Sequence, residues 1–138
     1  MIRIQSLWLA GTFLLGACSG ARPGADSTGA PVGNDTLRMH LRITQLEADA
    51  RALAHREGCE SAGGCRSAPV GVKGCGGPRR YIVYCAATTD SAALFRKLDE
   101  LAAEETRYNK ATNAISTCEL RLPPVPGVTA RSCNAPPP

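Results

Sequence analysis

The chain is poor in aromatic side chains, which make up 4% of its 138 residues. Trp8 and Phe13 both fall within the first 17 residues, so the remainder holds one phenylalanine and three tyrosines. Large aromatic rings usually supply much of the buried area of a small core. A domain of about 100 residues with so few of them is marginal on apolar packing alone. We therefore expect covalent cross-links to contribute to its stability.

The sequence patterns of several common functions are also missing. The formal net charge is only +4, and no basic stripe is interleaved with aromatic residues, which argues against nucleic acid as a partner. There is no C-x-x-C, C-x-x-C-H, G-x-S-x-G or G-K-[ST] pattern, so a redox dithiol, an attached haem, a hydrolase nucleophile and a phosphate loop are not indicated. We expect a protein that is not an enzyme and carries no cofactor.

No apolar run is long enough to cross a bilayer, which takes about 20 apolar residues. The longest one, Leu7–Leu15, follows a short start with one positive side chain, Arg3. It leads into the small residues Gly16 and Ala17 and then into Cys18. A short apolar run that ends in small residues is typical of a secretory signal peptide.

The segment Leu-Gly-Ala-Cys, residues 15–18, resembles the lipobox of bacterial lipoproteins. The resemblance implies that the Cys18 thiol receives a diacylglycerol and that residues 1–17 are cleaved off as a leader. It also implies attachment to a membrane through the N-terminal lipid. In that class an aspartate after the cysteine often retains the protein at the inner membrane, so Ser19 favours the outer membrane. An ordinary secretory leader with a chance cysteine is the alternative.

Composition divides the rest of the chain into a tether, one domain and a tail. Residues 18–35 are rich in small residues and proline and show no periodicity, so we interpret them as a lipidated N-terminus and a flexible tether. Residues 134–138 end in three prolines and are expected to be a disordered tail. Residues 36–133 are long enough for one small domain and hardly for two.

Two helices are predicted within this domain. Residues 36–44 alternate apolar and polar side chains like a strand, but they also fit a single helix that continues to residue 57. Good helix formers throughout favour the single helix, although Thr44 and Glu47 fit a capping box that would start a shorter one. A long second helix is expected over residues 91–111. Its inward side carries Leu94, Leu98, Leu101, Glu105 and Tyr108.

Strand signals are weaker than helix signals. Residues 81–86 are β-branched and aromatic and form the best candidate. Residues 119–122 and 128–133 are short candidates, and the glycine-rich residues 59–80 are predicted to be a loop. Together these elements predict an α+β fold with two helices and a two- or three-stranded antiparallel sheet.

If Cys18 carries the lipid, six cysteines remain, and this even number can form three disulfides in an oxidising compartment. These six are Cys59, Cys65, Cys75, Cys85, Cys118 and Cys133. Fifteen pairings are possible. We favour a local Cys59–Cys65 bond, a bond from Cys85 to Cys118 and, with the remaining two, a Cys75–Cys133 bond. Zinc is the rival interpretation, but the spacings contain no C-x₂-C pair, and no metal site is expected.

The most unusual segment is the glycine-rich stretch 71–81, which carries Lys73, Arg79 and Arg80. Flexible backbone next to cations could bind an anion, but a tight turn that leads into the following strand is the favoured interpretation. This stretch, together with the Cys-Arg pair at 65–66, resembles uncharacterised exported bacterial proteins with C-x₅-C-R followed by C-G-G-P-x-x-Y-x-V-Y. The resemblance covers residues 59–118 and implies one compact domain, with no activity attached.

Two functions from different classes remain open. The first is a monomeric, non-catalytic binding or structural module of the cell envelope, whose partner is an envelope protein or polymer. The second is a small disulfide-rich inhibitor of hydrolases such as proteases, in which the Gly71–Tyr81 loop would enter the active site of the target through Lys73, Arg79 or Arg80.

Overall fold

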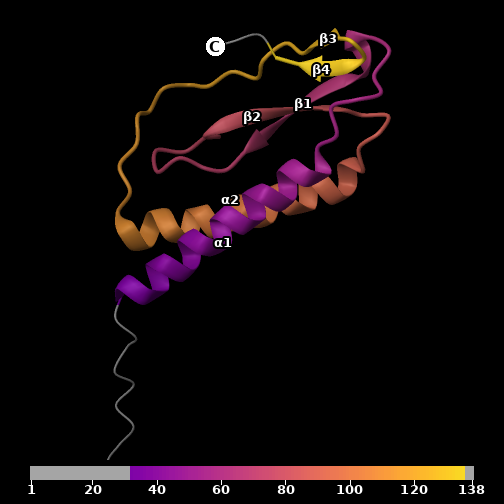
Figure 1. Ribbon diagram of the computed structural model, residues 1–138. Coiled ribbons are helices and arrows are strands. Elements are labelled where there is room, and N and C mark those ends of the chain that lie inside the picture. Colours follow the sequence, from indigo (N-terminus) through magenta and orange to yellow (C-terminus); the bar gives the residue numbers. More distant parts are fainter. Residues whose placement is uncertain (1–31, 136–138) are drawn as a thin grey trace, which may run out of the picture.

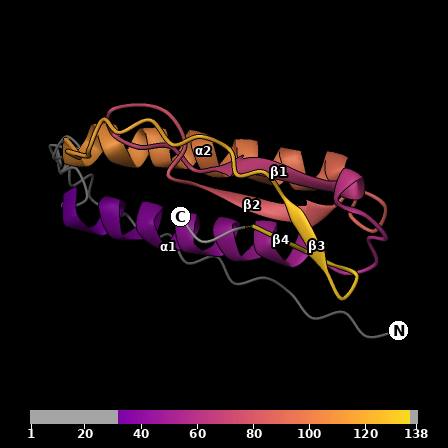
Figure 2. The same cartoon turned by 90° about the horizontal axis from the view of Figure 1, so that it is seen from above.

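A computed structural model describes residues 32–135 of the chain. Two long antiparallel helices lie beneath a two-stranded sheet, and a second small sheet sits above one end of the first (Figure 1). The view from above shows the helices side by side with the sheet over the line between them (Figure 2). The elements are α1 (Val32–Leu53), η1 (Ala62–Gly64), β1 (Cys65–Val70), β2 (Arg80–Cys85), α2 (Ser91–Thr112), β3 (Gly127–Thr129) and β4 (Ser132–Asn134). The predicted α+β class with two helices and antiparallel strands is confirmed.

The N-terminal segment is one helix, as favoured by its residue types, and it begins four residues earlier than the domain boundary that we expected. The predicted capping box is wrong because Thr44 lies in the middle of α1. Its hydroxyl donates to the carbonyl of His40 at 3.0 Å, a bond to the preceding helical turn. The expected helix start would have interrupted a continuous run of good helix formers.

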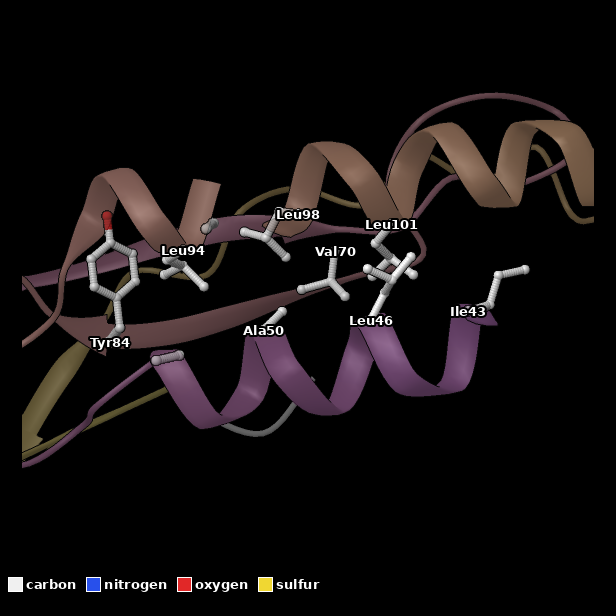
Figure 3. Close-up of a cluster of buried hydrophobic side chains, with 10 residues drawn as sticks. Ile43, Leu46, Ala50, Val70, Tyr84, Leu94, Leu98 and Leu101 are labelled. Atoms are coloured by element: carbon white, nitrogen blue, oxygen red, sulfur yellow. The ribbon is translucent and has the colours of Figure 1, made fainter. Parts of the chain in front are cut away.

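The main core lies between the helices and the lower face of the first sheet. Figure 3 shows Leu46 from α1, Leu98 and Leu101 from α2 and Val70 from β1 pointing toward one another. Leu94, Leu101 and Leu46 are at most 1% exposed. The apolar spacing that predicted the inward side of α2 is therefore correct, and Asp90 begins that helix by accepting a hydrogen bond from the backbone of Ala93.

The first sheet corrects one prediction. Residues 59–80 were expected to be a loop, but β1 lies within them and pairs antiparallel with β2, with Cys65 opposite Cys85 and Val70 opposite Arg80. Glycines around β1 and a proline within it weaken its sequence signal. Pro69 is tolerated because β1 is an edge strand, where a missing backbone N–H leaves no partner unsatisfied.

The C-terminal part also differs from expectation. Residues 119–122 form no strand and belong to an irregular connector, residues 114–126, that leads from α2 to the second sheet. The candidate strand at 128–133 is a hairpin instead, with Val128 opposite Cys133. Its turn residues Ala130 and Arg131 both have positive φ, which makes room for a reversal that the sequence pattern did not signal.

All six cysteines of the domain form disulfides, but none of the pairings that we favoured is correct. The bonds are Cys59–Cys85, Cys65–Cys133 and Cys75–Cys118. Cys65 and Cys85 lie opposite each other in the sheet, yet each bonds to a different element. The four sulfurs of the first two bonds therefore gather at one end of the sheet, where their cysteines are at most 4% exposed. They form a second apolar cluster with Val83 and Val128.

The segment after α1 joins the two sheets. The carbonyl of His55 accepts a hydrogen bond from Cys85 at the end of β2, and the carbonyl of Arg56 accepts one from Cys133 in β4. Glu57 forms an isolated antiparallel bridge with Ser132. Within residues 32–135, neither helix combines the length and the apolar character that a membrane-spanning helix needs.

Candidate functional site

The glycine-rich loop that the sequence singled out is a tight turn between β1 and β2. The backbone N–H of Lys73 donates to the carbonyl of Gly77 at 2.9 Å, and that of Gly76 donates to the carbonyl of Lys73 at the same distance. Gly71, Gly76 and Gly77 have φ values of +67°, +93° and +74°, which explains why glycine occupies these positions. This arrangement agrees with the favoured interpretation of the loop as a turn into the strand.

The two arginines that follow the turn, Arg79 and Arg80, are held in ion pairs. Arg79 contacts Glu105 of α2 through its Nε at 2.7 Å and Glu47 of α1 through its Nη2 at 2.8 Å. Arg80 contacts the other oxygen of Glu47 at 2.5 Å. Glu105, whose side chain is 6% exposed, also accepts a hydrogen bond from the backbone N–H of Val72. Two carboxylates and two guanidinium groups thus neutralise one another and join the loop to both helices.

The same network changes the ionisation of its members. Burial alone would raise the pKa of Glu47, but hydrogen bonds from Arg79 and Arg80 and the charges of both lower it to about 2. Burial alone would lower the pKa of Arg79, but its hydrogen bonds to Glu105 and Glu47 keep that pKa above its usual value. Glu47 and Arg79 are therefore charged at neutral pH, so neither supplies a proton donor or acceptor for acid–base chemistry there.

We expect the domain to lose stability in acid because of Glu47. Its folded pKa lies below the unfolded value of 4.5, so its contribution is complete above pH 4.5 and disappears as pH falls toward 2. After allowance for solvent screening, this loss should be about 2 kcal/mol. Thermal unfolding from pH 6 to pH 2 should show it, and Glu47→Gln should flatten the curve. Glu60→Gln is the control, because Glu60 lies in an exposed pair with Arg131. Equal curves for both variants would contradict this assignment.

The connector of residues 114–126 lies against the loop and is fastened to it at several points. Cys118 bonds to Cys75, and the backbone N–H of Cys75 donates to the hydroxyl of Ser116 at 3.0 Å. The ammonium group of Lys73 donates to the carbonyl of Glu119. The hydroxyl of Tyr81 in β2 donates to the carbonyl of Arg121 at 3.3 Å. The loop therefore serves as a support for the connector, which is why Lys73 is not free to act elsewhere.

The connector exposes apolar side chains to solvent despite being fastened. Ile115, Leu120, Leu122 and Val125 are 99%, 79%, 72% and 83% exposed. The residues from 122 to 126 read Leu-Pro-Pro-Val-Pro, so each is either a proline or directly precedes one. Both situations restrict the backbone to extended or polyproline conformations. This surface combines a restricted backbone with a ridge of uncovered apolar side chains.

The hollows beside the ion-pair network and the loop are small and open to solvent. One hollow of about 260 Å³ lies between the helices, lined in part by His40, Glu47, Arg79, Glu105 and Tyr108. Two others, of about 250 and 290 Å³, lie beside Lys73 and beside Arg80. Among residues 32–135, no buried polar side-chain atom lacks a hydrogen-bond partner. These hollows therefore offer no unpaired buried group for a ligand to contact.

The cysteines are the only described residues that gather like metal ligands. The sulfurs of Cys59, Cys65 and Cys133 lie within 4.8 Å of one another. All three belong to disulfides, and only a thiolate binds a metal ion. These three cysteines therefore cross-link the chain through two disulfides and offer no thiolate to a metal ion.

No family model, curated protein or solved structure matches this chain. Of the residues singled out in the sequence, Lys73 and Arg79 lie in the loop between β1 and β2, and Arg80 begins β2. Their charged groups contact the connector and the two helices. Cys18 lies outside the described residues. Sequence reasoning missed the connector because residues 119–122 were assigned to a strand. Residues 122–126, each of which is a proline or directly precedes one, were the signal that could have identified the connector.

Proposed function

We propose that this protein is a lipid-anchored, non-catalytic binding module of the cell envelope, and that the connector is its recognition segment. The lipid attachment follows from the lipobox-like residues 15–18 and their place after an apolar run. Three disulfides suit an oxidising compartment beyond the inner membrane.

One observation carries the choice of the connector. Leu120, Leu122 and Val125 remain more than two thirds exposed while the segment around them is held by Cys118 and by Tyr81. Apolar side chains that stay uncovered on a stable domain often mark an interaction site. A segment that is already held in an extended form loses little conformational entropy when it binds.

The chemistry of the segment favours a protein partner with an aromatic groove. In a polyproline helix three residues make one turn, so Leu122 and Val125 lie on one edge. Grooves lined by aromatic side chains recognise such edges in proline-rich ligands. Arg121, which is exposed, stands beside this edge and would suit an acidic residue at the rim of the groove.

The inhibitor alternative receives less support from the same geometry. A basic side chain that enters a protease pocket must project from its loop into solvent. Arg79 and Arg80 instead pair with Glu47 and Glu105, and Lys73 contacts the carbonyl of Glu119. Withdrawing these groups would break the network that holds the loop to both helices. For this reason we prefer the connector to the loop as the binding segment.

The proposal predicts position-specific cross-linking in the producing cell. A photoreactive amino acid at residue 122 or 125 should give one protein adduct in the envelope fraction, and Arg121→Asp should reduce its yield about fivefold. The same amino acid at Phe95, which is 40% exposed on α2, is the control. Equal adduct patterns at all three positions would contradict recognition by the connector.

The lipid anchor is tested separately from recognition. The intact mass of the purified natural protein should correspond to a chain that starts at residue 18 and carries acyl groups. Cys18→Ser should remove those groups and shift the protein from the membrane to the soluble fraction. An unmodified mass would overturn the anchor and leave the cross-linking result to stand on its own.

A further inference from the structure

Helix α1 carries a second apolar stripe on the side opposite the core. Leu37, Leu41, Ala48 and Ala52 fall within about 60° of arc when successive residues turn by about 100°. Leu37 and Leu41 are 56% and 59% exposed, and both alanines are exposed as well. In Figure 2, α1 forms one side of the molecule, and its outer face points away from α2 and from both sheets. A surface helix that packs on one side only needs one apolar stripe.

The stripe has an internal symmetry that points to its partner. Leu37 and Ala52 are equally far from the midpoint between Thr44 and Gln45, and the same holds for Leu41 and Ala48. In an antiparallel pair of identical helices with a two-fold axis at this midpoint, each leucine of one copy faces an alanine of the other. Large residues opposite small ones allow two helices to interdigitate without voids.

We propose that this face of α1 binds a second copy of the chain, giving an antiparallel, two-fold symmetric dimer. This dimer does not depend on the lipid anchor. It differs from the monomeric state that we expected from the sequence. A two-fold contact uses the same patch on both copies, which is the arrangement that the leucine–alanine spacing fits.

Charges beside the stripe support the antiparallel orientation. Arg38 and Asp49 lie on the same flank of the stripe. The position symmetric to Arg38 about the midpoint is residue 51, and Asp49 is two residues from it, which is about 3 Å along a helix. Within its own chain Arg38 lies 3.8 Å from Asp35, and Asp49 lies 4.0 Å from Lys97. In the dimer each Arg38 also comes within reach of Asp49 of the other copy, so both charges gain a second partner across the contact. Their side chains are 77% and 37% exposed. On the opposite flank, Arg51 is paired with Glu47 of its own chain at 2.8 Å. The two-fold axis places the two Arg51 residues about 20 Å apart along the helices, so they do not repel each other at close range.

The polar residues at the midpoint can be covered at small cost. The hydroxyl of Thr44 is bonded to the carbonyl of His40, and the amide nitrogen of Gln45 donates to Asp49 at 2.7 Å. Both groups thus have partners within their own helix, and a buried polar group with a partner avoids most of the desolvation penalty. The contact remains small, so we expect weak association in solution, strengthened wherever copies are concentrated.

The test is sedimentation equilibrium of the full natural chain, in density-matched detergent if it is lipidated. As the protein concentration increases, the apparent molar mass should rise from that of one chain to that of two. Leu41→Asp should weaken the dimer by at least about tenfold, because it places a charge in the apolar contact. Leu122→Asp is the matched control, since that leucine is also exposed, at 72% against 59% for Leu41, but lies on the connector. A mass of one chain at about 1 mM, or equal effects of the two variants, would overturn the proposal.

A charge exchange tests the orientation. Arg38→Asp and Asp49→Arg should each weaken the dimer about threefold, and the double exchange should restore it to within about twofold of the natural chain. Double exchange as weak as the single variants would overturn the antiparallel arrangement. The dimer would also be overturned if the protein stayed monomeric and probes attached at residues 37 and 41 entered a lipid bilayer. That result would assign this face of α1 to a membrane surface instead.

Discussion

Replacing Cys65 and Cys133 together by alanine should cost about 5–6 kcal/mol of unfolding free energy. The bond closes a separation of 68 residues, for which loss of unfolded-state entropy alone accounts for about 4 kcal/mol. Both cysteines are at most 4% exposed, so shorter side chains also leave unfilled space beside Val83. Domains of this size are stable by about 5–15 kcal/mol, and this one has few large core side chains. We therefore expect a largely unfolded protein at 37 °C, measured by urea denaturation followed by circular dichroism.

The control for this experiment is the double alanine variant of Cys75 and Cys118. That bond closes a separation of 43 residues, but both of its cysteines are exposed, so no core space is left behind. We expect it to cost about 4 kcal/mol and to release the connector while both helices remain folded. If the two double variants had the same stability, the buried sulfur cluster would add nothing beyond chain entropy.

Gly71→Ala should destabilise the domain by about 3–4 kcal/mol. Gly71 has a φ of +67°, and a side-chain carbon there would lie 2.2 Å from Oε2 of Glu105 and 2.8 Å from Nε of Arg79. One part of the cost is the left-handed backbone, about 1 kcal/mol for a residue with a side chain. The larger part is displacement of Glu105, because its separation from Arg79 leaves charges in a buried site. Thermal unfolding at pH 7 provides the measurement.

Gly76→Ala separates these two contributions. Gly76 has a φ of +93°, but a side-chain carbon there meets no atom within 4 Å. The variant should cost only about 1 kcal/mol, which is the backbone contribution alone. Equal losses for the two variants would show that contact with Glu105 does not explain why residue 71 is glycine. It would also weaken the view that the ion-pair network holds the loop in place.

The helices could be predicted because their signals are local. Leu94, Leu98 and Leu101 repeat at helical spacing, and this spacing placed them correctly in the core. The same reasoning explains the errors. Thr44 and Glu47 fit a capping pattern, but the residues before them are equally good helix formers, so the helix continues through them. A local pattern does not say which of two compatible structures the rest of the chain stabilises.

The strands and the site could not be predicted in the same way. Strand β1 has only six residues, including Pro69, and becomes recognisable only through its pairing with β2. Arg79 looked available as a free cation because its carboxylate partners lie 26 and 32 residues away. Residues 119–122 of the connector were mistaken for a strand because their alternation of leucine with charged residues resembles one, but they pair with a strand of neither sheet.

By itself, the sequence determined the class of the fold, the two helices with the inward face of the second, and the use of six cysteines as three cross-links. These properties depend on residue types and short spacings, which each segment carries independently of the others. Only the tertiary structure decided which cysteines bond, which carboxylates hold Arg79 and Arg80, and which leucines stay uncovered. Those outcomes depend on distances between segments far apart in the chain, and packing sets such distances only when all the segments are in place.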